Sequence, residues 1–308
     1  MTHQFVQRPS VRSSDGTELA VFEAGNPEGP VLVAVHGYPD NHTVWAPIAA
    51  ELGDRYRVVA YDVRGAGASA KPTVRSSYKI ARLTEDFAAV IDDVSPDAPV
   101  HLLAHDWGSI QMWGAVVDPS FADRIASYTS ISGPCLDYIG VWMRDRSHPG
   151  ASLRQALHSW YIAAFQIPWL PERIVRLGGV QAGIARSEGK GQPGGVLRSP
   201  VARSEADMVN GIQLYRANMG PRLSRPQPVR TGVPVQVLAP RGDAYVSVRL
   251  ATEVPVPFVE DLTVHEIDGT HWVVSEDPEL VGGLVEAHIA AHTNAGSSDP
   301  QRNPRTAG

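Results

Sequence analysis

Hydrophobic and polar positions follow two patterns along the chain. Five short runs are almost continuously apolar and read VLVAVHG (31–37), YRVVAYD (56–62), VHLLAHD (100–106), IASYTSISG (125–133) and VPVQVLAPRGD (233–243). Such runs are typical of strands buried on both faces of a sheet. The segment ARLTEDFAAVIDDV (81–94) instead places its apolar residues on one side of a helix and most of its acidic residues elsewhere. This alternation predicts an α/β fold with a mostly parallel central sheet flanked by helices.

The pattern changes between residues 136 and 229, where aromatic helical segments replace the strands, and a strand pattern resumes at Val233. We therefore expect one core built from residues 1–135 and 230–292, with residues 136–229 inserted as a helical cap. An insertion that follows a strand of the sheet can roof a site at the carboxyl ends of the strands. Residues 293–308 are polar and rich in Gly, Ser and Pro, which predicts a disordered tail.

Composition narrows the classes of partner. The net charge of -6 predicts no basic surface for nucleic acid or for a membrane, and no apolar stretch approaches the length of a membrane span. The first residues lack the apolar core of a signal peptide, and the single cysteine, Cys135, fits a reducing compartment, so the cytoplasm is the expected location. No His or Cys cluster has the spacing of metal ligands, and we expect neither a metal nor an organic cofactor.

The stretch HLLAHDWGSI (101–110) reads as a strand that enters a tight turn and then a helix, with Asp106 at the tip. Ala104 and Gly108 are the small neighbours that a nucleophile on such a turn requires. A serine at this place would suit acyl transfer, whereas a carboxylate is suited to attack on saturated carbon. Asp106 is therefore the expected nucleophile.

Two later residues complete a candidate catalytic triad. Asp243 follows another predicted strand, and His271 lies in a glycine-containing loop before the last predicted helix. The order nucleophile, acid, histidine is that of one known class of hydrolase. We expect Asp243 to orient His271, which would activate water. Asp137, near the end of the strand before the insertion, is the second candidate for the acid.

An oxyanion hole is expected beside the turn. The segment HGYPDNHTVW (36–45) follows the first apolar run, and the backbone N–H groups of Tyr38 and Trp107 are its candidate donors. Gly37 permits the turn, His36 is expected to brace the loop, and the sequence leaves open whether Pro39 is cis.

Together with YDVRGAGASAKP (61–72), these motifs resemble α/β-hydrolase-fold epoxide hydrolases of the soluble type, over nearly all of residues 10–292. The resemblance implies that an epoxide and water yield a vicinal diol through a covalent alkyl-enzyme ester on Asp106. It also implies that two cap tyrosines hold the epoxide oxygen. These are Tyr161 in WYIAAFQIP (160–168) and Tyr215 in LYRANM (214–219). The oligomeric state stays open, with a homodimer as one alternative.

Three other functions share part of this residue pattern or of this fold. Haloalkane dehalogenases share the HDWG signature; Tyr38 has no side-chain N–H to hold a halide, although Trp45 and Trp107 do. A non-catalytic ligand-binding protein of the same fold would be expected to lack some of these catalytic parts. A serine esterase would need Ser109, which lies three residues beyond the tip of the turn.

Overall fold

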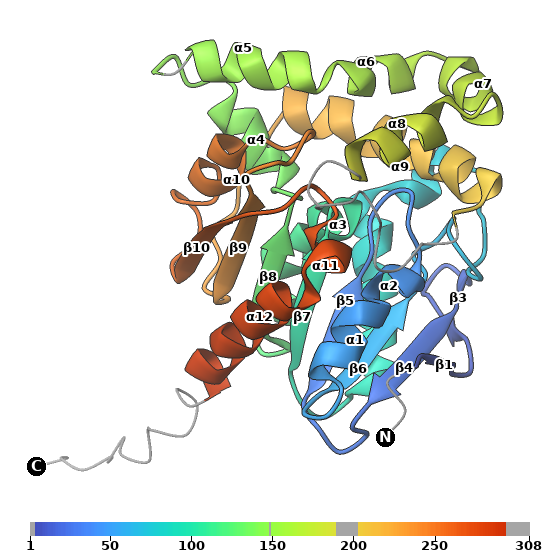
Figure 1. The fold of residues 1–308 in the computed structure, drawn as a ribbon, viewed down its shortest axis with the longest axis vertical. Coiled ribbons are helices and arrows are strands. Elements are labelled where there is room, and N and C mark those ends of the chain that lie inside the picture. Colours follow the sequence, from blue (N-terminus) through green and yellow to red (C-terminus); the bar gives the residue numbers. More distant parts are fainter. Residues whose placement is uncertain (1–3, 148, 189–202, 294–308) are drawn as a thin grey trace, which may run out of the picture.

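The computed structural model describes residues 4–147, 149–188 and 203–293. Its strands are β1 (Val6–Gln7), β2 (Val11–Arg12), β3 (Glu18–Leu19), β4 (Val21–Gly25), β5 (Val31–Val35), β6 (Arg57–Tyr61), β7 (Val100–His105), β8 (Ile125–Ile131), β9 (Val235–Pro240) and β10 (Leu262–Ile267). Eight of them form one sheet in the order β1-β4-β6-β5-β7-β8-β9-β10 (Figure 1), and β2 pairs with β3 separately. β1 and β4 run antiparallel to their neighbours, whereas all pairs from β6 to β10 are parallel. The predicted mostly parallel sheet is confirmed.

Helices cover both faces of this sheet. They are α1 (Ala46–Leu52), α2 (Ile80–Val94), α3 (Trp107–Val116), α4 (Leu136–Trp142), α5 (Pro149–His158), α6 (Trp160–Gln166), α7 (Leu170–Arg176), α8 (Gly179–Glu188), α9 (Glu205–Ser224), α10 (Val248–Glu253), α11 (Val273–Glu276) and α12 (Pro278–Thr293). Short 3-10 helices are η1 (His42–Trp45), η2 (Arg75–Tyr78) and η3 (Pro119–Phe121). None of the described helices is both long enough and apolar enough to cross a bilayer.

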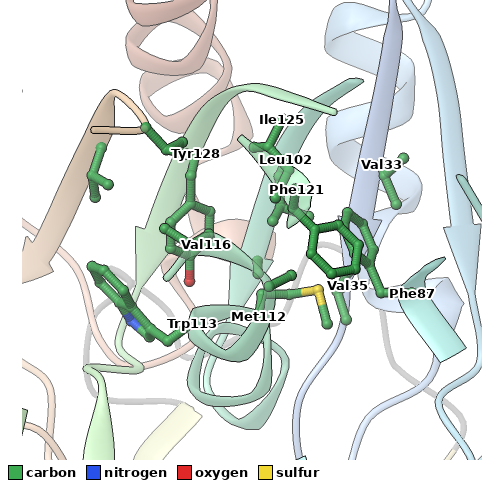
Figure 2. Packing of buried hydrophobic residues seen from close by; sticks show 14 of the residues in the cluster. Val33, Val35, Phe87, Leu102, Met112, Trp113, Val116, Phe121, Ile125 and Tyr128 are labelled. Carbon is green, nitrogen blue, oxygen red and sulfur yellow. The ribbon is translucent and has the colours of Figure 1, made fainter. Parts of the chain in front are cut away.

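Successive residues of the central strands enter different hydrophobic cores. Val33 and Val35 of β5 pack with α2 and α3, whereas Leu32 and Ala34 of the same strand pack with α1 and α12. Figure 2 shows the first of these cores, where side chains of α3 meet those of the strands. Because side chains of a strand alternate between its faces, burial of both sets explains why these runs are continuously apolar.

The order of the strands also indicates where on the sheet a site should lie. β5 lies between β6, which follows it in sequence, and β7, so the direction of winding reverses between β5 and β7. In open parallel sheets, such a reversal leaves a crevice at the carboxyl ends of the two strands. The loop after β5 carries Tyr38, and the turn after β7 carries Asp106.

Between β8 and β9 the described chain is helical, from α4 to α9. Figure 1 shows α5 to α9 at one end of the molecule, above the sheet. Side chains from this part form a third buried cluster with core residues, and they include Phe165 and Tyr215 next to Tyr38 and Trp107. The helices therefore lie directly over the crevice.

Some features differ from the sequence analysis. β4 and β10 were not predicted, because Glu23 interrupts the apolar run of β4, and β10, a partly exposed edge strand, lacks a continuous apolar run. Most acidic residues of α2 were expected away from its apolar side. Asp86 is nevertheless buried, because Arg64 meets it with Nε 2.6 Å from Oδ2. Helix α12 continues through Thr293, the first residue of the expected tail; residues 294–308 lie outside the described residues.

Candidate active site

Asp106 is the single residue between β7 and α3, and its backbone conformation is unusual. Its φ of 53° and ψ of −124° fall in a region that residues other than glycine rarely adopt. Its backbone N–H donates to Ile131 O at 2.9 Å, and its carbonyl accepts from Ile110 N at 2.9 Å. A strained residue held on both sides in this way presents its side chain at the tip of the turn, as the sequence predicts.

Three glycines make room for this turn. A Cβ atom on Gly108 would overlap the carbonyl oxygen of Val35 of β5, and one on Gly37 would overlap the Asp106 side chain. A Cβ atom on Gly133, just after β8, would overlap the carbonyl oxygen of Asp106. Gly108 was expected as a small neighbour of Asp106, and Gly37 was expected only to permit the turn of its own loop. Gly133 was not predicted, because it reaches the turn only through the pairing of β7 with β8.

His271 lies between two carboxylates. Its Nδ1 is 3.0 Å from Asp243 Oδ2, and its Nε2 is 3.5 Å from Asp106 Oδ2. The other Asp243 oxygen accepts the backbone N–H groups of Tyr245 at 2.7 Å and Val246 at 3.0 Å. The acid is thus held by its own turn, and the geometry matches the predicted order of the three side chains.

Burial and charge act in opposite directions on this histidine. Burial alone would lower the pKa of His271, but the Asp243 carboxylate and, next, Asp106 raise it well above the ordinary histidine value. Burial likewise opposes ionisation of Asp243, yet His271 and the two backbone N–H groups hold the pKa of this carboxyl below its usual value. At neutral pH this favours an imidazolium between two carboxylates.

The loop after β5 brings a backbone donor to Asp106. Tyr38 N–H donates to Asp106 Oδ1 at 2.7 Å, and the Tyr38–Pro39 peptide bond is cis. Trp107 is the first residue of α3, so its N–H is one of the helix amides that have no acceptor within the helix. Asp106 Oδ1 therefore faces a backbone donor, while Oδ2 faces His271.

Tyr161 of α6 and Tyr215 of α9 lie on the opposite side of one cavity of about 240 Å³, whose lining also includes Asp106 and His271. Their ring centroids are 6.1 Å apart. Burial raises the pKa of both phenols, and the nearby Asp106 carboxylate raises it further. Both hydroxyl groups therefore remain protonated and can donate hydrogen bonds.

Side-chain hydrogen bonds hold α9 in place. Arg216, directly after Tyr215, donates from Nε to Phe165 O at 2.8 Å and from Nη2 to Ile167 O at 2.9 Å, at the end of the helix that carries Tyr161. Its Nη1 also pairs with Glu172 Oε1 of α7 at 2.5 Å. Toward the core, Tyr38 donates its hydroxyl to Met208 O of α9 at 3.0 Å. One arginine thus links the segments that carry the two tyrosines.

Two neighbours of His271 were not predicted from the sequence. Tyr245 lines the cavity, and its ring centroid is 4.8 Å from that of His271 and 5.8 Å from that of Tyr161. His105 donates from Nε2 to the backbone oxygen of His271 at 2.7 Å. The sequence signal that could have identified both residues is their position, because Tyr245 lies two residues after Asp243 and His105 directly precedes Asp106.

The remaining candidates lie elsewhere. Asp137 accepts from Arg222 Nη1 at 2.5 Å and from Gln227 N at 2.9 Å, so Asp243 is the carboxylate that meets His271. Ser109 is buried and lies 2.6 Å from the Tyr128 hydroxyl, below the turn. His36 accepts from Val63 N at 3.0 Å, in agreement with its expected bracing role.

Comparison with known proteins agrees with this fold. Residues 30–185, about half of the chain, match the family model described as the alpha/beta hydrolase fold. The protein named Probable oxidoreductase EphD from Mycobacterium tuberculosis is 37% identical over 290 residues, which cover 89% of this chain and 48% of that protein. Epoxide hydrolase A from the same organism is 30% identical over 241 residues, which cover 76% of this chain and 66% of that protein. The chain thus spans about half the length of the first of these relatives.

Solved structures agree as well. A structure described under novel epoxide hydrolases in metagenomes from hot environments has a TM-score of 0.75 and 21% identity, with 94% of this chain and 100% of that chain covered. An epoxide hydrolase from Vigna radiata has a TM-score of 0.69 and 24% identity, with 94% and 99% covered. At these identities the similarity concerns the fold. With the matching family model and the strand order, it leads to one conclusion: the chain belongs to the α/β-hydrolase fold family.

Proposed function

We propose that this protein is an epoxide hydrolase, which adds water to an epoxide and releases a vicinal diol. The observation that carries the proposal is the lining of a single cavity by Asp106, His271 and the two phenols of Tyr161 and Tyr215. A carboxylate can attack a saturated carbon, and phenols opposite it can donate to the oxygen that leaves that carbon. The names of Epoxide hydrolase A and of the similar solved structures support the same reaction.

In the first step, Asp106 attacks one carbon of the epoxide ring. A new C–O bond forms to a carboxylate oxygen as the C–O bond of the ring breaks. The released oxygen takes a proton from Tyr161 or Tyr215, whose hydroxyls donate to it throughout. We assign the attack to Oδ2, since Tyr38 N–H holds Oδ1 at 2.7 Å. The product of this step is an alkyl ester on Asp106.

In the second step, His271 removes a proton from water, and the hydroxide attacks the ester carbonyl carbon of Asp106. The backbone N–H groups of Tyr38 and Trp107 stabilise the oxyanion, a contribution of about 3 kcal/mol per donor in comparable enzymes. When the intermediate collapses, the bond between the carbonyl carbon of Asp106 and the ester oxygen breaks, so the diol leaves with the former carboxylate oxygen. The imidazolium returns its proton to this departing alkoxide while Asp243 keeps the ring oriented. The proton left on the new carboxyl group of Asp106 passes to the phenolate formed in the first step, which restores both the carboxylate and the phenol.

We propose the domain organisation 1–135 and 230–292 for the core and 136–229 for the cap. In this assignment the core supplies nucleophile, base and acid, and the cap supplies the two phenols. Support comes from the elements that carry each side chain, because Tyr161 and Tyr215 lie on α6 and α9 whereas Asp106, Asp243 and His271 follow strands of the sheet.

Halide release is the second candidate, since dehalogenation would use the same nucleophile. A departing halide needs N–H donors, and the Tyr38 hydroxyl is already donated to Met208 O. Trp45 is fully buried in the core around α1, away from the cavity. Of the donors considered, Trp107 alone lies beside Asp106, which favours the epoxide over the halide.

A panel of aryl and alkyl epoxides and of haloalkanes tests the proposal, with diol measured by chromatography and halide by ion chromatography. We expect diol formation with at least one epoxide class and no halide above the background of an Asp106→Asn variant. Halide release without diol would replace the proposal with dehalogenation. Saturable binding of epoxides without turnover would favour a ligand-binding protein.

A further inference from the structure

The outer helices of residues 149–185 carry an unusual number of exposed large apolar side chains. We call this set the apolar face; it comprises Leu153, Leu157, Trp160, Ile167, Trp169, Ile174 and Leu177. Trp160 is 69% exposed, Trp169 64% and Leu177 82%. Isolated exposed apolar residues are ordinary, but a group of this size on neighbouring elements marks an interaction surface.

The spacing and packing of these residues place them near one another. Leu153 and Leu157 are four residues apart on α5, so they share one side of that helix, and Trp160 begins the next helix. α5, α6 and α7 follow one another along the chain, and each contacts the next. Figure 1 shows these three helices in a row at the end of the molecule opposite β1 and α12. The apolar face therefore covers an outer surface of the cap helices.

This surface is continuous with the cavity of the candidate active site. Trp160 and Ile174 are both exposed, and both also line the cavity that contains Asp106 and His271. The same side chains thus border the interior of the cavity and the solvent. An apolar molecule could pass from this surface into the cavity without first being surrounded by water.

Trp169 adds a further observation. Its φ of 61° places it in the left-handed region, which is uncommon for a bulky residue. Its indole is 64% exposed and belongs to the apolar face. Backbone outliers of this kind are held by the surrounding structure and cluster at functional sites.

The charge of the same segment identifies a partner. Residues 149–185 contain three arginines, Arg154, Arg173 and Arg176, and one acidic residue, Glu172, in a chain of net charge −6. All three arginines are exposed; Arg176 Nε lies 3.8 Å from Glu205 Oε1 of α9, and Glu172 pairs with Arg216 Nη1 at 2.5 Å. Arginine and tryptophan beside exposed leucine are the composition of surfaces that rest in the headgroup region of anionic bilayers.

We propose that the apolar face docks on the surface of an anionic lipid bilayer, with its tryptophans and leucines in the interface and its arginines against the headgroups. The net charge of −6 predicts no membrane-binding surface, but the local charge of this segment is opposite in sign to that of the whole chain. Docking would place the mouth of the cavity at the level where apolar substrates partition. It concerns binding alone, so it does not depend on the proposed reaction.

Co-sedimentation with vesicles tests the proposal on the full chain. One set of vesicles is pure phosphatidylcholine, and the other contains 30% phosphatidylglycerol, about the fraction that gives a clearly anionic surface. We expect binding to the anionic vesicles, weakened at high salt, and at least tenfold weaker binding of a Leu153→Ser/Leu157→Ser/Trp169→Ser variant. The matched control is Val74→Ser/Val256→Ser, which changes two residues that are each 60% exposed outside the face. Circular dichroism confirms that the variants fold.

Two results would overturn the proposal that the apolar face docks on a bilayer. Absence of binding of the unchanged protein to the anionic vesicles excludes a lipid partner, and equal binding of the triple variant and the control excludes this face. Analytical ultracentrifugation adds a third arm. A dimer that the triple variant converts to a monomer, without vesicle binding, would assign the face to a second copy of the chain.

Discussion

The two sides of the cavity are built by different means. On the core side, backbone structure holds the nucleophile: Asp106 sits between a strand and a helix, with Gly37, Gly108 and Gly133 packed against its turn and Tyr38 N–H on one oxygen. On the other side, Tyr161 and Tyr215 are ordinary helical residues. Side-chain bonds link their segments, two from Arg216 and one from Gln166 Nε2 to Tyr215 O. A side-chain substitution cannot remove a backbone donor, and the turn itself is sensitive only where a larger residue replaces one of its three glycines, whereas a side-chain link is removed by replacing the residue that makes it. The two halves should therefore respond differently to mutation.

Removal of the nucleophile should have the largest effect. We expect Asp106→Asn to lower the rate of diol formation on the order of 10⁴-fold, because a neutral amide is a poor nucleophile. The amide has the shape of the carboxylate and can still accept from Tyr38 N–H, so the fold should be unchanged by circular dichroism. A variant that keeps a tenth of the activity would show that another group attacks.

Loss of one phenol should cost less. Tyr161→Phe and Tyr215→Phe should each lower the rate of ester formation roughly 10²-fold, since one donor remains for the epoxide oxygen. Rapid-quench kinetics separates ester formation from ester hydrolysis, and hydrolysis should stay within about twofold, since it uses core residues. Equal slowing of both steps would contradict the division between the two sides. Tyr56→Phe, a change outside the cavity, is the control.

The pH dependence should also differ between the two steps. In the free protein, Asp243 and Asp106 raise the pKa of His271, so the imidazolium is favoured and can pair with the ionised nucleophile. Esterification removes the charge of Asp106, and with it one of the causes that raise the pKa. Hydrolysis still needs neutral His271, so the rate of hydrolysis should fall about tenfold for each pH unit below the pKa that His271 has in the esterified protein.

Single-turnover measurements between pH 5 and 9, roughly the range around an ordinary histidine, test this difference. Ester formation should persist to lower pH than ester hydrolysis does. Coincident acid limits for the two steps would contradict it. Asp243→Asn removes the main partner that raises the pKa, so the acid limit of hydrolysis should move to lower pH even as the maximal rate falls.

The smallest expected effect concerns Arg216, which we regard as a positioning residue. Arg216→Gln loses the pair with Glu172 and should slow ester formation roughly tenfold, because displaced phenols stabilise the oxygen less well. Arg222→Gln breaks a similar pair with Asp137 on the same helix, away from the cavity, and should leave the rate unchanged. Slower ester hydrolysis in the Arg216 variant, or an equal loss in both variants, would point to a general structural effect.

The same contrast explains how much of the protein could be predicted from its sequence. Strands buried on both faces, such as β5 and β7, were predicted because their continuous apolar runs require such burial. β10 was missed because an edge strand with partly exposed residues has no such run. The burial of Asp86 could not be foreseen, because it depends on Arg64 arriving from a different loop.

For the site, residues next to a strand end were accessible to sequence reasoning, whereas those brought in by packing were not. Asp106, Asp243 and His271 each follow a recognisable local pattern, and the structure brings them within hydrogen-bond or ion-pair distance. Tyr161 and Tyr215 came from the family resemblance, since nothing in a helical tyrosine itself indicates a cavity. Gly133 has its effect only through the folded contact with Asp106.

The account depends most on the covalent ester, and mass spectrometry of a His271→Gln variant tests it directly. Without the base, incubation with a reactive epoxide should leave the protein heavier by the mass of that epoxide, and peptide mapping should place the added mass on Asp106. The Asp106→Asn/His271→Gln double variant is the control and should gain nothing. An unmodified Asp106 under saturating epoxide, while the protein with His271 intact still forms diol, would contradict the ester mechanism.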